Sequence, residues 1–454
     1  MSLQKTDLTH GNVSGSSGPV FPVRTEQSFF ADFHIHSAYS RATSRDMRPE
    51  TIARAAAAKG LALVGTGDFT HPEWLGELRE ALEPAEPGLY MLKGRPDSPR
   101  FMLTAEISNI FTQGGRGRRI HTVVFAPDFE VAEDIQNRLA AIGNIHSDGR
   151  PIFGFPVKEL VRLCLEASPD CFIIPAHVWT PWFALFGAKS GFDSLEECFE
   201  EQSCHIHALE TGLSSDPQMN WRISALDRYA LVSNSDAHSP SKLAREANVF
   251  SCEMNYHSVC AAIRGEIPGF DGTIEFFPEE GKYHYDGHRA CNICLKPSET
   301  RRHDGLCPVC GRPLTVGVMH RVEELADRPE GFVPSSARPC LHVIPLEEIV
   351  REVYGIKTVT KRVRKTCETL VEHFGSELGL LLHVPEDELR EGLTDEMFRA
   401  ITAARRGDVR IFPGHDGVYG RVSINAEGVE MERACGKTGT ERERKVHRQK
   451  KLFG

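Results

Sequence analysis

A chain of 454 residues is too long for one ordinary domain of about 100–200 residues, so two or three hydrophobic cores are expected. Apolar residues make up 40% of the chain and charged residues 26%, a balance that excludes a fibrous or disordered protein. The net charge of −10 argues against binding nucleic acid through the overall field of the protein, so any such contact must be local.

The sequence also indicates the cellular compartment of the protein. No apolar stretch approaches the roughly 20 residues that span a bilayer, and the N-terminus lacks the basic-then-apolar pattern of a signal peptide. The 13 cysteines are an odd number, which suits intracellular thiols and metal ligands better than a set of disulfides. We therefore expect a cytoplasmic protein without membrane contact.

The first predicted unit covers residues 29–282, after a Gly- and Ser-rich flexible tail at 1–28. Here short apolar runs typical of buried strands alternate with helical patterns. The predicted strands are 29–35, 62–68, 101–108, 121–126, 171–178, 207–211 and 230–236. The predicted helices are 49–60, 158–167 and 223–230. Strands separated by helices predict an α/β fold with a parallel sheet, and about seven such units favour a distorted, closed or nearly closed barrel.

The second predicted unit, residues 283–320, is a cysteine module. Cys291, Cys294, Cys307 and Cys310 form C-x2-C-x12-C-x2-C, the spacing of a structural zinc ribbon. Four thiolates leave a tetrahedral zinc no open position, so this metal would organise a small domain and would not catalyse.

A third predicted unit, residues 321–430, is helical, with amphipathic patterns at 345–355, 359–375 and 394–407, and a basic tail follows at 431–454. Four cations share one predicted helix and would suit phosphate contacts that position a nucleic acid: Lys361, Arg362, Arg364 and Lys365. A solvated basic face explains them equally well. The glycine-rich segment 412–420 is either an ordinary hairpin turn or a close approach to a nucleic-acid backbone.

Histidines and carboxylates fall at or beside the ends of most strands in the first unit. His34 and His36 alternate on one strand and point to the same face. The others are Asp68, His71, Glu106, His121, His177, Asp236 and His238. Imidazole and carboxylate suit zinc or manganese, and a carboxylate such as Glu106 can bridge two ions. Two or three ions there would clamp the attacking and leaving oxygens of a phosphoryl centre.

These segments resemble a known superfamily. FHIHS, Asp68, AEIS, PAHV and NSDAH are similar to the successive motifs of PHP (polymerase and histidinol phosphatase) phosphoesterases. The resemblance implies a PHP-type (βα)7 barrel in which those nine residues bind two or three Zn²⁺ ions, with Mn²⁺ or Mg²⁺ as alternatives. It also implies that Asp236, Glu106 and His36 carry catalysis. This chain departs from the usual compact T-D-H by reading GDFTH, which puts His71 in doubt.

The variants GTGDFTHP and PAHVWTPW resemble the endonuclease Q branch, a similarity that extends over about residues 29–424. That resemblance implies a DNA repair endonuclease that cuts damaged duplex or single-stranded DNA on the 5′ side of uracil, hypoxanthine, xanthine or an abasic site. Repair or replication proteins would be its partners. Trp179, Trp182 and Phe183 follow His177 and would either fill the gap left by an extruded base or simply cover the core.

Two rival functions stay open at this stage. One is a small-molecule phosphoesterase of the histidinol-phosphate phosphatase kind, which would have no need of the two additional C-terminal units. The other is a non-catalytic module that assembles with a helicase or polymerase, which the intact ligand set disfavours. Glu210 and Asn234 lie on strands near the site, where they either face a base or support the ligands.

Overall fold

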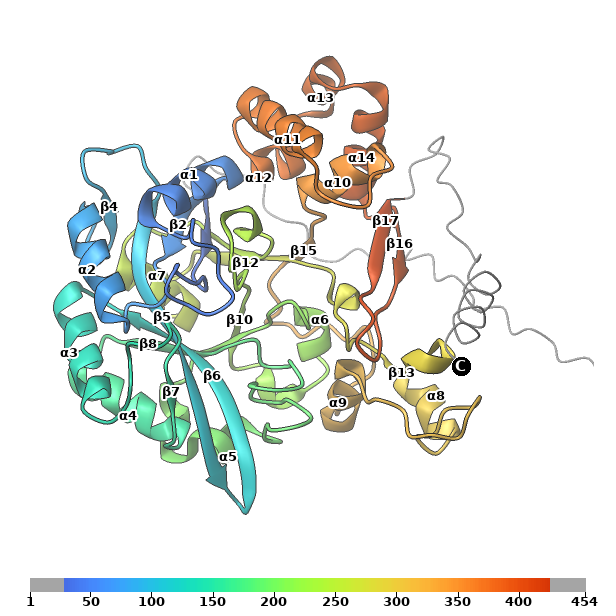
Figure 1. Cartoon of the computed structure of the whole chain (residues 1–454), viewed down its shortest axis with the longest axis horizontal. Coiled ribbons are helices and arrows are strands. Elements are labelled where there is room, and N and C mark those ends of the chain that lie inside the picture. Colours follow the sequence, from blue (N-terminus) through green and yellow to red (C-terminus); the bar gives the residue numbers. More distant parts are fainter. Residues whose placement is uncertain (1–27, 425–454) are drawn as a thin grey trace, which may run out of the picture.

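A computed structural model describes residues 28–424, which fold around a central mixed sheet (Figure 1). Eight strands follow one another in the order β15-β12-β11-β1-β2-β5-β4-β3; β6 pairs with β5 and β8, and β7 pairs with β5. The strands are β1 (Phe29–Asp32), β2 (Leu61–Gly65), β3 (Leu82–Pro84), β4 (Tyr90–Leu92), β5 (Arg100–Gln113), β6 (Arg116–Ala126), β7 (Ile152–Phe153), β8 (Phe172–Pro175), β11 (Ala247–Phe250), β12 (Phe270–Glu275) and β15 (Cys340–His342). The predicted α/β class with a central sheet is confirmed, while both predicted tails lie outside the described residues except for Ser28.

The sheet is not wholly parallel, and that part of the prediction was wrong. β1, β2 and β5 are parallel neighbours, but β5 and β6 form a long antiparallel hairpin, and β6 is antiparallel to β8. Gly114 and Gly115 connect the hairpin, with φ angles of 61° and 72° that glycine adopts without a steric penalty. Because two residues join these strands directly, no crossover helix can make them parallel.

A separate pair of parallel strands completes the first region: β9 (Ala208–Glu210) and β10 (Ala230–Val232). Just beyond β10, Ala237 bridges to Ile35, which joins the segment after β10 to the segment after β1. The helix predicted at 223–230 is absent, since only a 3-10 turn at Ser224–Leu226 forms before β10 begins. The chain there is too short for an α-helix between that turn and the strand.

Helices cover the sheet and bury its apolar side chains. α1 shows how the sequence sets their limits: Pro49 occupies the first turn, and Gly60 ends the helix in the left-handed conformation at φ 95°. The helices of this region are α1 (Pro49–Lys59), α2 (Pro72–Ala81), α3 (Phe129–Ala140), α4 (Val157–Ala167), α5 (Leu195–Phe199), α6 (Pro217–Asn220) and α7 (Tyr256–Arg264). In the described part of the chain, no helix is long and apolar enough to cross a membrane.

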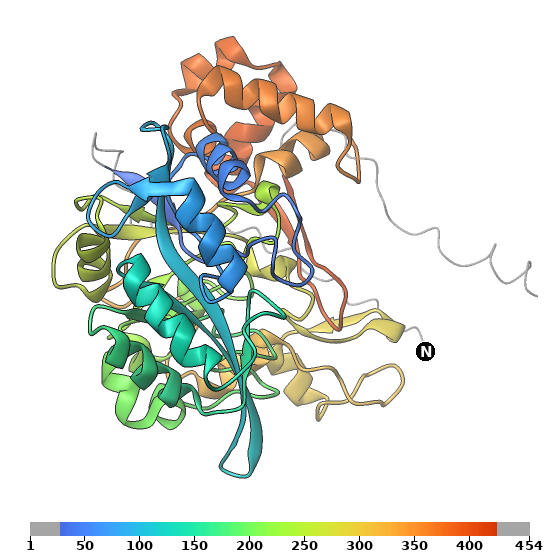
Figure 2. The same cartoon turned by 60° about the vertical axis from the view of Figure 1, so that its left-hand side comes forward.

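Two further groups of elements lie beside the sheet region (Figures 1 and 2). The first follows β12 and contains β13 (Asp286–His288), β14 (Ile293–Leu295), α8 (Pro297–Arg302) and α9 (Val318–Leu325). The second has a core of its own and contains α10 (Leu346–Val353), α11 (Lys361–Phe374), α12 (Glu377–Leu382), α13 (Glu386–Gly392) and α14 (Asp395–Arg406). The antiparallel hairpin of β16 (Val409–Phe412) and β17 (Arg421–Ile424) runs from these helices toward β13 (Figure 1). Residues 413–420 connect the two strands of this hairpin.

Candidate metal centres

The two histidines after β1 point inward and are oriented by buried carboxylates. His34 and His36 are 1% and 0% exposed. Nδ1 of His34 lies 3.0 Å from both carboxylate oxygens of Glu210, and Nδ1 of His36 lies 3.1 Å from Oδ1 of Asp68. Because one ring nitrogen is held in this way, the other is aimed at the opposite side of the site. The structure therefore fixes both Nε2 atoms toward Glu106 and Asp236.

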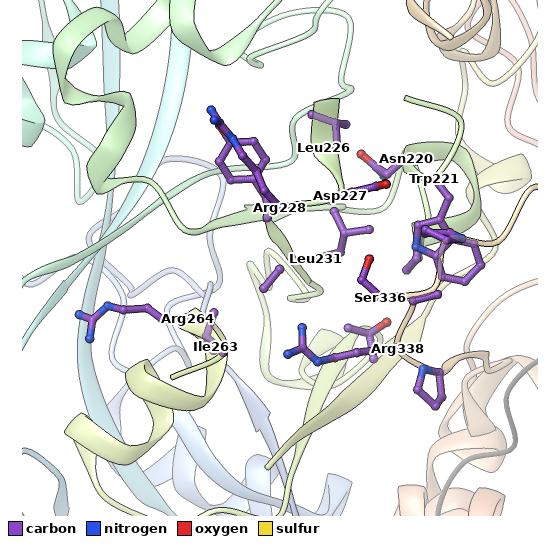
Figure 3. A pocket seen from close by; sticks show the side chains of 18 residues that line it. Asn220, Trp221, Leu226, Asp227, Arg228, Leu231, Ile263, Arg264, Ser336 and Arg338 are labelled. Atoms are coloured by element: carbon purple, nitrogen blue, oxygen red, sulfur yellow. The ribbon is translucent and has the colours of Figure 1, made fainter. Parts of the chain in front are cut away.

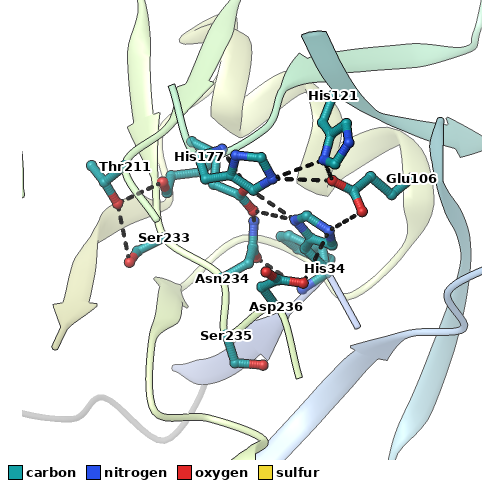
Figure 4. Close-up of polar contacts among 12 residues, drawn as sticks. His34, Glu106, His121, His177, Thr211, Ser233, Asn234, Ser235 and Asp236 are labelled. Carbon is teal, nitrogen blue, oxygen red and sulfur yellow. Dashed lines mark hydrogen bonds and ion pairs between the residues drawn. The ribbon is translucent and has the colours of Figure 1, made fainter. Parts of the chain in front are cut away.

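Those four side chains form a first cluster of possible metal ligands. Figure 4 shows His34, Glu106 and Asp236 of this cluster. Nε2 of His36 lies 3.0 Å from Oδ1 of Asp236 and 3.2 Å from Oε2 of Glu106, and Nε2 of His34 lies 3.4 Å from the same Glu106 oxygen. Nε2 of His34 is buried without a hydrogen-bond partner in the described residues. A buried nitrogen aimed at two carboxylates and otherwise unpartnered fits a site built for a cation.

The second cluster uses the other oxygen of Glu106. Oε1 of Glu106, from β5, lies 2.6 Å from Nδ1 of His121, from β6, and 3.1 Å from Nε2 of His177, which follows β8. Nδ1 of His121 and Nε2 of His177 are 3.3 Å apart. Glu106 thus connects the two clusters through its two oxygens, the arrangement of a bridging carboxylate between adjacent ions.

Backbone strain marks the same place. Asp68, His177 and Asp236 follow β2, β8 and β10, and have φ angles of 52°, 32° and 47°. Side chains with a Cβ adopt such angles at a cost of about 1–3 kcal/mol each, and strained residues concentrate at functional sites. Gly212 permits the close approach, because a Cβ there would lie 2.5 Å from Cβ of His177. Three residues of the site that follow strands thus have left-handed backbone.

Charge interactions in the site oppose the effect of burial. Burial raises the pKa of Glu106, but His121, Arg150 and His34 lower it well below its usual range. Burial lowers the pKa of His34, yet Glu210 and Glu106 raise it well above the ordinary value, and Asp68 and Asp236 act likewise on the pKa of His36. By contrast, burial lowers the pKa of His121 to about 4. Attraction among the carboxylates, the imidazoles of His34 and His36 and the Arg150 guanidinium thus opposes the cost of burying these groups.

Three predicted ligands lie outside both clusters. Asp68 is occupied by hydrogen bonds: Oδ2 accepts from the backbone N–H and hydroxyl of Ser37 and the hydroxyl of Ser40. His71 stacks on Tyr39, and its Nε2 lies 3.1 Å from the carbonyl oxygen of His146. The ring of His238 lies 4.4 Å from that of His36 at the partly exposed rim.

Arg150 is the main residue that the sequence did not reveal. It lies between α3 and β7, is partly buried, and its Nη1 donates to Oε2 of Glu106 at 2.9 Å. Its pKa is raised by that carboxylate. No periodicity or spacing singles out an arginine in the loop sequence SDGRP, so only the fold identifies it.

Glu210 and Asn234 support the ligands. Oε2 of Glu210 accepts from the backbone N–H of His177 at 2.8 Å, and Oε1 accepts from Nδ2 of Asn234 at 2.8 Å. Oδ1 of Asn234 in turn accepts from the backbone N–H of Phe33 at 2.9 Å. All these groups are buried, so neither side chain is free to face a base.

The cysteine module forms a third group of possible ligands, but with a different membership from the predicted one. Cys291, Cys307 and Cys310 come together with His288, whereas Cys294 lies outside the group. Sγ of Cys310 is 3.4 Å from Nδ1 of His288. The structure thus supports three of the four predicted cysteines as neighbours.

The residues predicted to contact nucleic acid differ in their exposure to solvent. Trp179 is 1% exposed and donates from Nε1 to Oδ1 of Asn220, so it is a core residue and not a surface contact. Trp182 is 41% exposed and packs edge-on against Tyr283. Phe183 packs against the ring of His121, which places this loop beside the second cluster. The four cations of α11 are all exposed.

A cavity of about 200 Å³ lies apart from these clusters, between the start of β10, the end of α7 and residues 334–339 (Figure 3). Arg228, Arg264 and Arg338 line it. It adjoins the beginning of β10, whereas Asp236 follows the end of that strand. None of the predicted site residues lines this cavity, so it is separate from the clusters.

The chain is similar to several known proteins over most of its length. The crystal structure of the lesion-specific endonuclease PfuEndoQ from Pyrococcus furiosus is 30% identical and superposes with a TM-score of 0.78 over 89% of this chain and 98% of that one. An endonuclease Q in complex with a 27-mer duplex that carries an abasic lesion at the active site is 30% identical, with a TM-score of 0.77 over 90% and 99% of the two chains. The uncharacterized protein YqxK of Bacillus subtilis is 30% identical over 87% of this chain and 99% of its own length.

A family model for the MJ0043 C-terminal domain matches residues 345–408. The uncharacterized protein MJ0043 of Methanocaldococcus jannaschii is 31% identical over 57% of this chain, which spans 32% of that protein's length. With the mixed α/β fold and clusters of His, Asp and Glu around one shared carboxylate, these similarities define a metal-dependent hydrolase. The chain belongs to the endonuclease Q family.

Proposed function

We propose that this protein is a DNA repair endonuclease that hydrolyses the phosphodiester on the 5′ side of uracil, hypoxanthine, xanthine or an abasic site. The observation that carries the proposal is the pair of ligand clusters joined by Glu106 in a chain that aligns with endonuclease Q over nearly its full length. A relative holds duplex DNA with an abasic lesion at its active site, which supports a DNA substrate here.

In this proposal the catalytic site holds two divalent ions, Zn²⁺ or alternatively Mn²⁺ or Mg²⁺. His34, His36 and Asp236 would hold one ion, His121 and His177 the other, and Glu106 both. When bound, such a pair supplies positive charge that stabilises the attacking and leaving oxygens of an in-line displacement. Asp68, His71 and His238, which are outside the clusters, act in other roles.

The chain's own residues then orient these ligands and the substrate. Asp68 and Glu210 hold the Nδ1 atoms of His36 and His34, so the ligand nitrogens are positioned before any metal arrives. Arg150 reaches the shared carboxylate from the rim of the site, and its planar guanidinium suits a phosphate oxygen. We propose that Arg150 binds the scissile phosphate.

The same proposal assigns three units to the chain. Residues 29–282 form a distorted PHP-type barrel, 283–320 a zinc ribbon, and 321–430 a helical DNA-binding domain, of which 425–430 lie outside the described residues. The separate core around α10 to α14 supports the last unit. Trp182 would contact DNA beside the metal ions, and Lys361, Arg362, Arg364 and Lys365 would contact phosphates along α11.

Duplexes with one deoxyuridine, deoxyinosine or abasic site test the proposal, beside matched undamaged duplexes and nitrophenyl phosphate. Fast nicking of damaged strands only, with the damaged nucleotide at the 5′ end of the downstream fragment, is the expected result. Equal rates on damaged and undamaged DNA would remove the repair function. Efficient hydrolysis of the monoester, unchanged when residues 345–454 are deleted so that β15 stays in the central sheet, would favour a small-molecule phosphoesterase.

A further inference from the structure

The cysteine module contains more candidate ligands than a tetrahedral site needs. Cys307 and Cys310 form one C-x2-C pair, while the first half of the module reads H-x2-C-x2-C, with His288, Cys291 and Cys294. Two pairs of spacing two are therefore available in the first half. Sequence spacing does not choose between His288–Cys291 and Cys291–Cys294.

The register of the β13–β14 ribbon separates the two candidates. His288 pairs with Ile293, and Gly287 pairs with Cys294. Directly paired residues share a face of a two-stranded ribbon, and successive residues alternate between faces. His288 and Cys294 therefore point to opposite faces, and only one of them can meet the second half of the module.

Backbone conformation also distinguishes them. In the second half, Cys310 is followed by Gly311 in the left-handed region at φ 70°, which closes the turn that carries Cys307 and Cys310. In the first half, Cys291 is followed by Asn292 at φ 52°. In each half, a left-handed residue thus follows the second ligand of the pair. By this comparison His288 corresponds to Cys307, and Cys291 corresponds to Cys310.

Cys294 has different surroundings. Its Sγ lies 3.9 Å from the carbonyl oxygen of Pro413, in the connection of the β16–β17 hairpin. On the same face of the ribbon, a Cβ at Gly287 would lie 2.6 Å from a ring carbon of His415. This face of the ribbon is therefore packed against the hairpin and turned away from the other three cysteines.

We propose that the fourth ligand of the module is His288, so that the site is Cys3His with the spacing H-x2-C-x15-C-x2-C, and that Cys294 is a packing residue. The inference rests on the proposed function in one respect, namely that this module holds a structural zinc. Three thiolates and one imidazole are a common closed ligand set for structural zinc. Nδ1 of His288 lies 3.4 Å from Sγ of Cys310, a separation that suits two ligands of one tetrahedral ion.

The test uses the full-length zinc-loaded protein with three variants: His288→Ala, His288→Cys and the matched control Cys294→Ser. Zinc content, zinc affinity by chelator competition, and thermal melting are measured for each. We expect Cys294→Ser to keep all its zinc and its melting temperature. His288→Ala should weaken one zinc by more than the ~10–100-fold that loss of an outer-sphere partner costs, and His288→Cys should restore it.

Cobalt substitution gives a readout independent of folding yield. Thiolate-to-cobalt charge-transfer absorption reports the module alone, because the catalytic clusters contain no cysteine. Its intensity should rise in His288→Cys, where four thiolates bind, and stay at the wild-type value in Cys294→Ser. Loss of that absorption and of one zinc in Cys294→Ser, with His288→Ala unchanged, would overturn the assignment of His288. Absence of thiolate-bound cobalt from the wild-type protein would instead overturn the zinc ribbon itself.

Discussion

The catalytic clusters and the cysteine module both gather metal-binding side chains, but they obtain their geometry from opposite sources. In the clusters, candidate ligands come from segments as far apart in sequence as His34 and Asp236, and buried carboxylates fix the imidazoles. In the module, all candidate ligands lie within His288–Cys310, and among them only Cys307 is buried. A large core can therefore prepare a reactive site in advance, whereas a small module with few buried ligands is expected to need a bound metal for its fold.

The largest effect is expected from removing a ligand of the catalytic clusters. His36→Ala and Asp236→Asn should each reduce cleavage by about a thousandfold or more, because several kcal/mol of charge stabilisation are lost at 1.4 kcal/mol per factor of ten. The fold should stay largely intact, since both substitutions remove a possible metal ligand and neither removes a side chain of the hydrophobic core. Nicking rates and melting curves check this, with the exposed Glu253→Gln as control. Turnover at the wild-type rate by either variant would remove the ligand assignment.

Cys307→Ser should show the reverse pattern in the module. One zinc should be lost, and the module should unfold at a lower temperature because its folding free energy comes from the metal. DNA cleavage should fall through disorder of the binding surface, while hydrolysis of a small phosphodiester stays near the wild-type rate. A Cys307→Ser protein with full zinc content and an unchanged melting profile would contradict the structural zinc site.

Changes to the orienting carboxylates should be intermediate. Glu210→Gln and Asp68→Asn keep the shape of the side chain but remove the charge that holds His34 or His36. Metal affinity or activity should fall about 10–100-fold, the usual cost of losing an outer-sphere partner. Excess metal should recover much of the activity, which would not happen if these residues acted directly on the substrate. Metal titrations followed by nicking assays distinguish the two cases.

Acidification should weaken metal binding at the clusters. The surrounding carboxylates raise the pKa values of His34 and His36 well above the ordinary value, which favours the protonated form of both rings when metal is absent. Metal binding requires neutral imidazole and must displace those protons, so apparent affinity should rise with pH, by up to about tenfold per proton per pH unit. Calorimetry in buffers of different ionisation enthalpy would measure the proton release. Affinity independent of pH between 6 and 8 would contradict this charge arrangement.

The smallest effect is expected on α11. Lys361→Gln and Arg364→Gln should weaken binding to damaged and undamaged duplexes alike, and each should reduce the salt slope by about one. Lys93→Gln, an exposed cation near β4, serves as control. If a protein with both substitutions binds DNA with unchanged salt dependence, α11 is a solvated basic face and not a DNA contact.

Much of the site was predictable because its residues fall at strand ends in a fixed order. His34, His36, Glu106, His121, His177 and Asp236 all enter the two clusters. Sequence alone did not separate ligands from their supports, since a carboxylate such as Asp68 has the same chemistry in either role. Hydrogen bonds from Ser37 and Ser40, visible only in three dimensions, occupy one oxygen of Asp68 and are the reason for proposing a supporting role.

Other differences have equally specific causes. The Gly114–Gly115 turn converts two predicted parallel units into a hairpin, a signal that was present in the sequence as a glycine pair. Trp179 is in the core because its indole N–H finds a buried partner, which spacing does not reveal. The exclusion of Cys294 depends on the register of one short ribbon, and a shift of one residue would reverse it.

The central claim is that two catalytic ions share Glu106 and that the cysteine module holds one further, independent ion. The number of metal ions bound per chain tests this claim most directly. The wild-type protein should hold about three zinc equivalents per chain, two in the clusters and one in the module. Glu106→Gln, whose amide nitrogen cannot accept a metal, should retain only the module's zinc, whereas Cys307→Ser should retain the two catalytic ions. A Glu106→Gln protein that keeps its full metal content would contradict the shared carboxylate, and with it the account of the catalytic site.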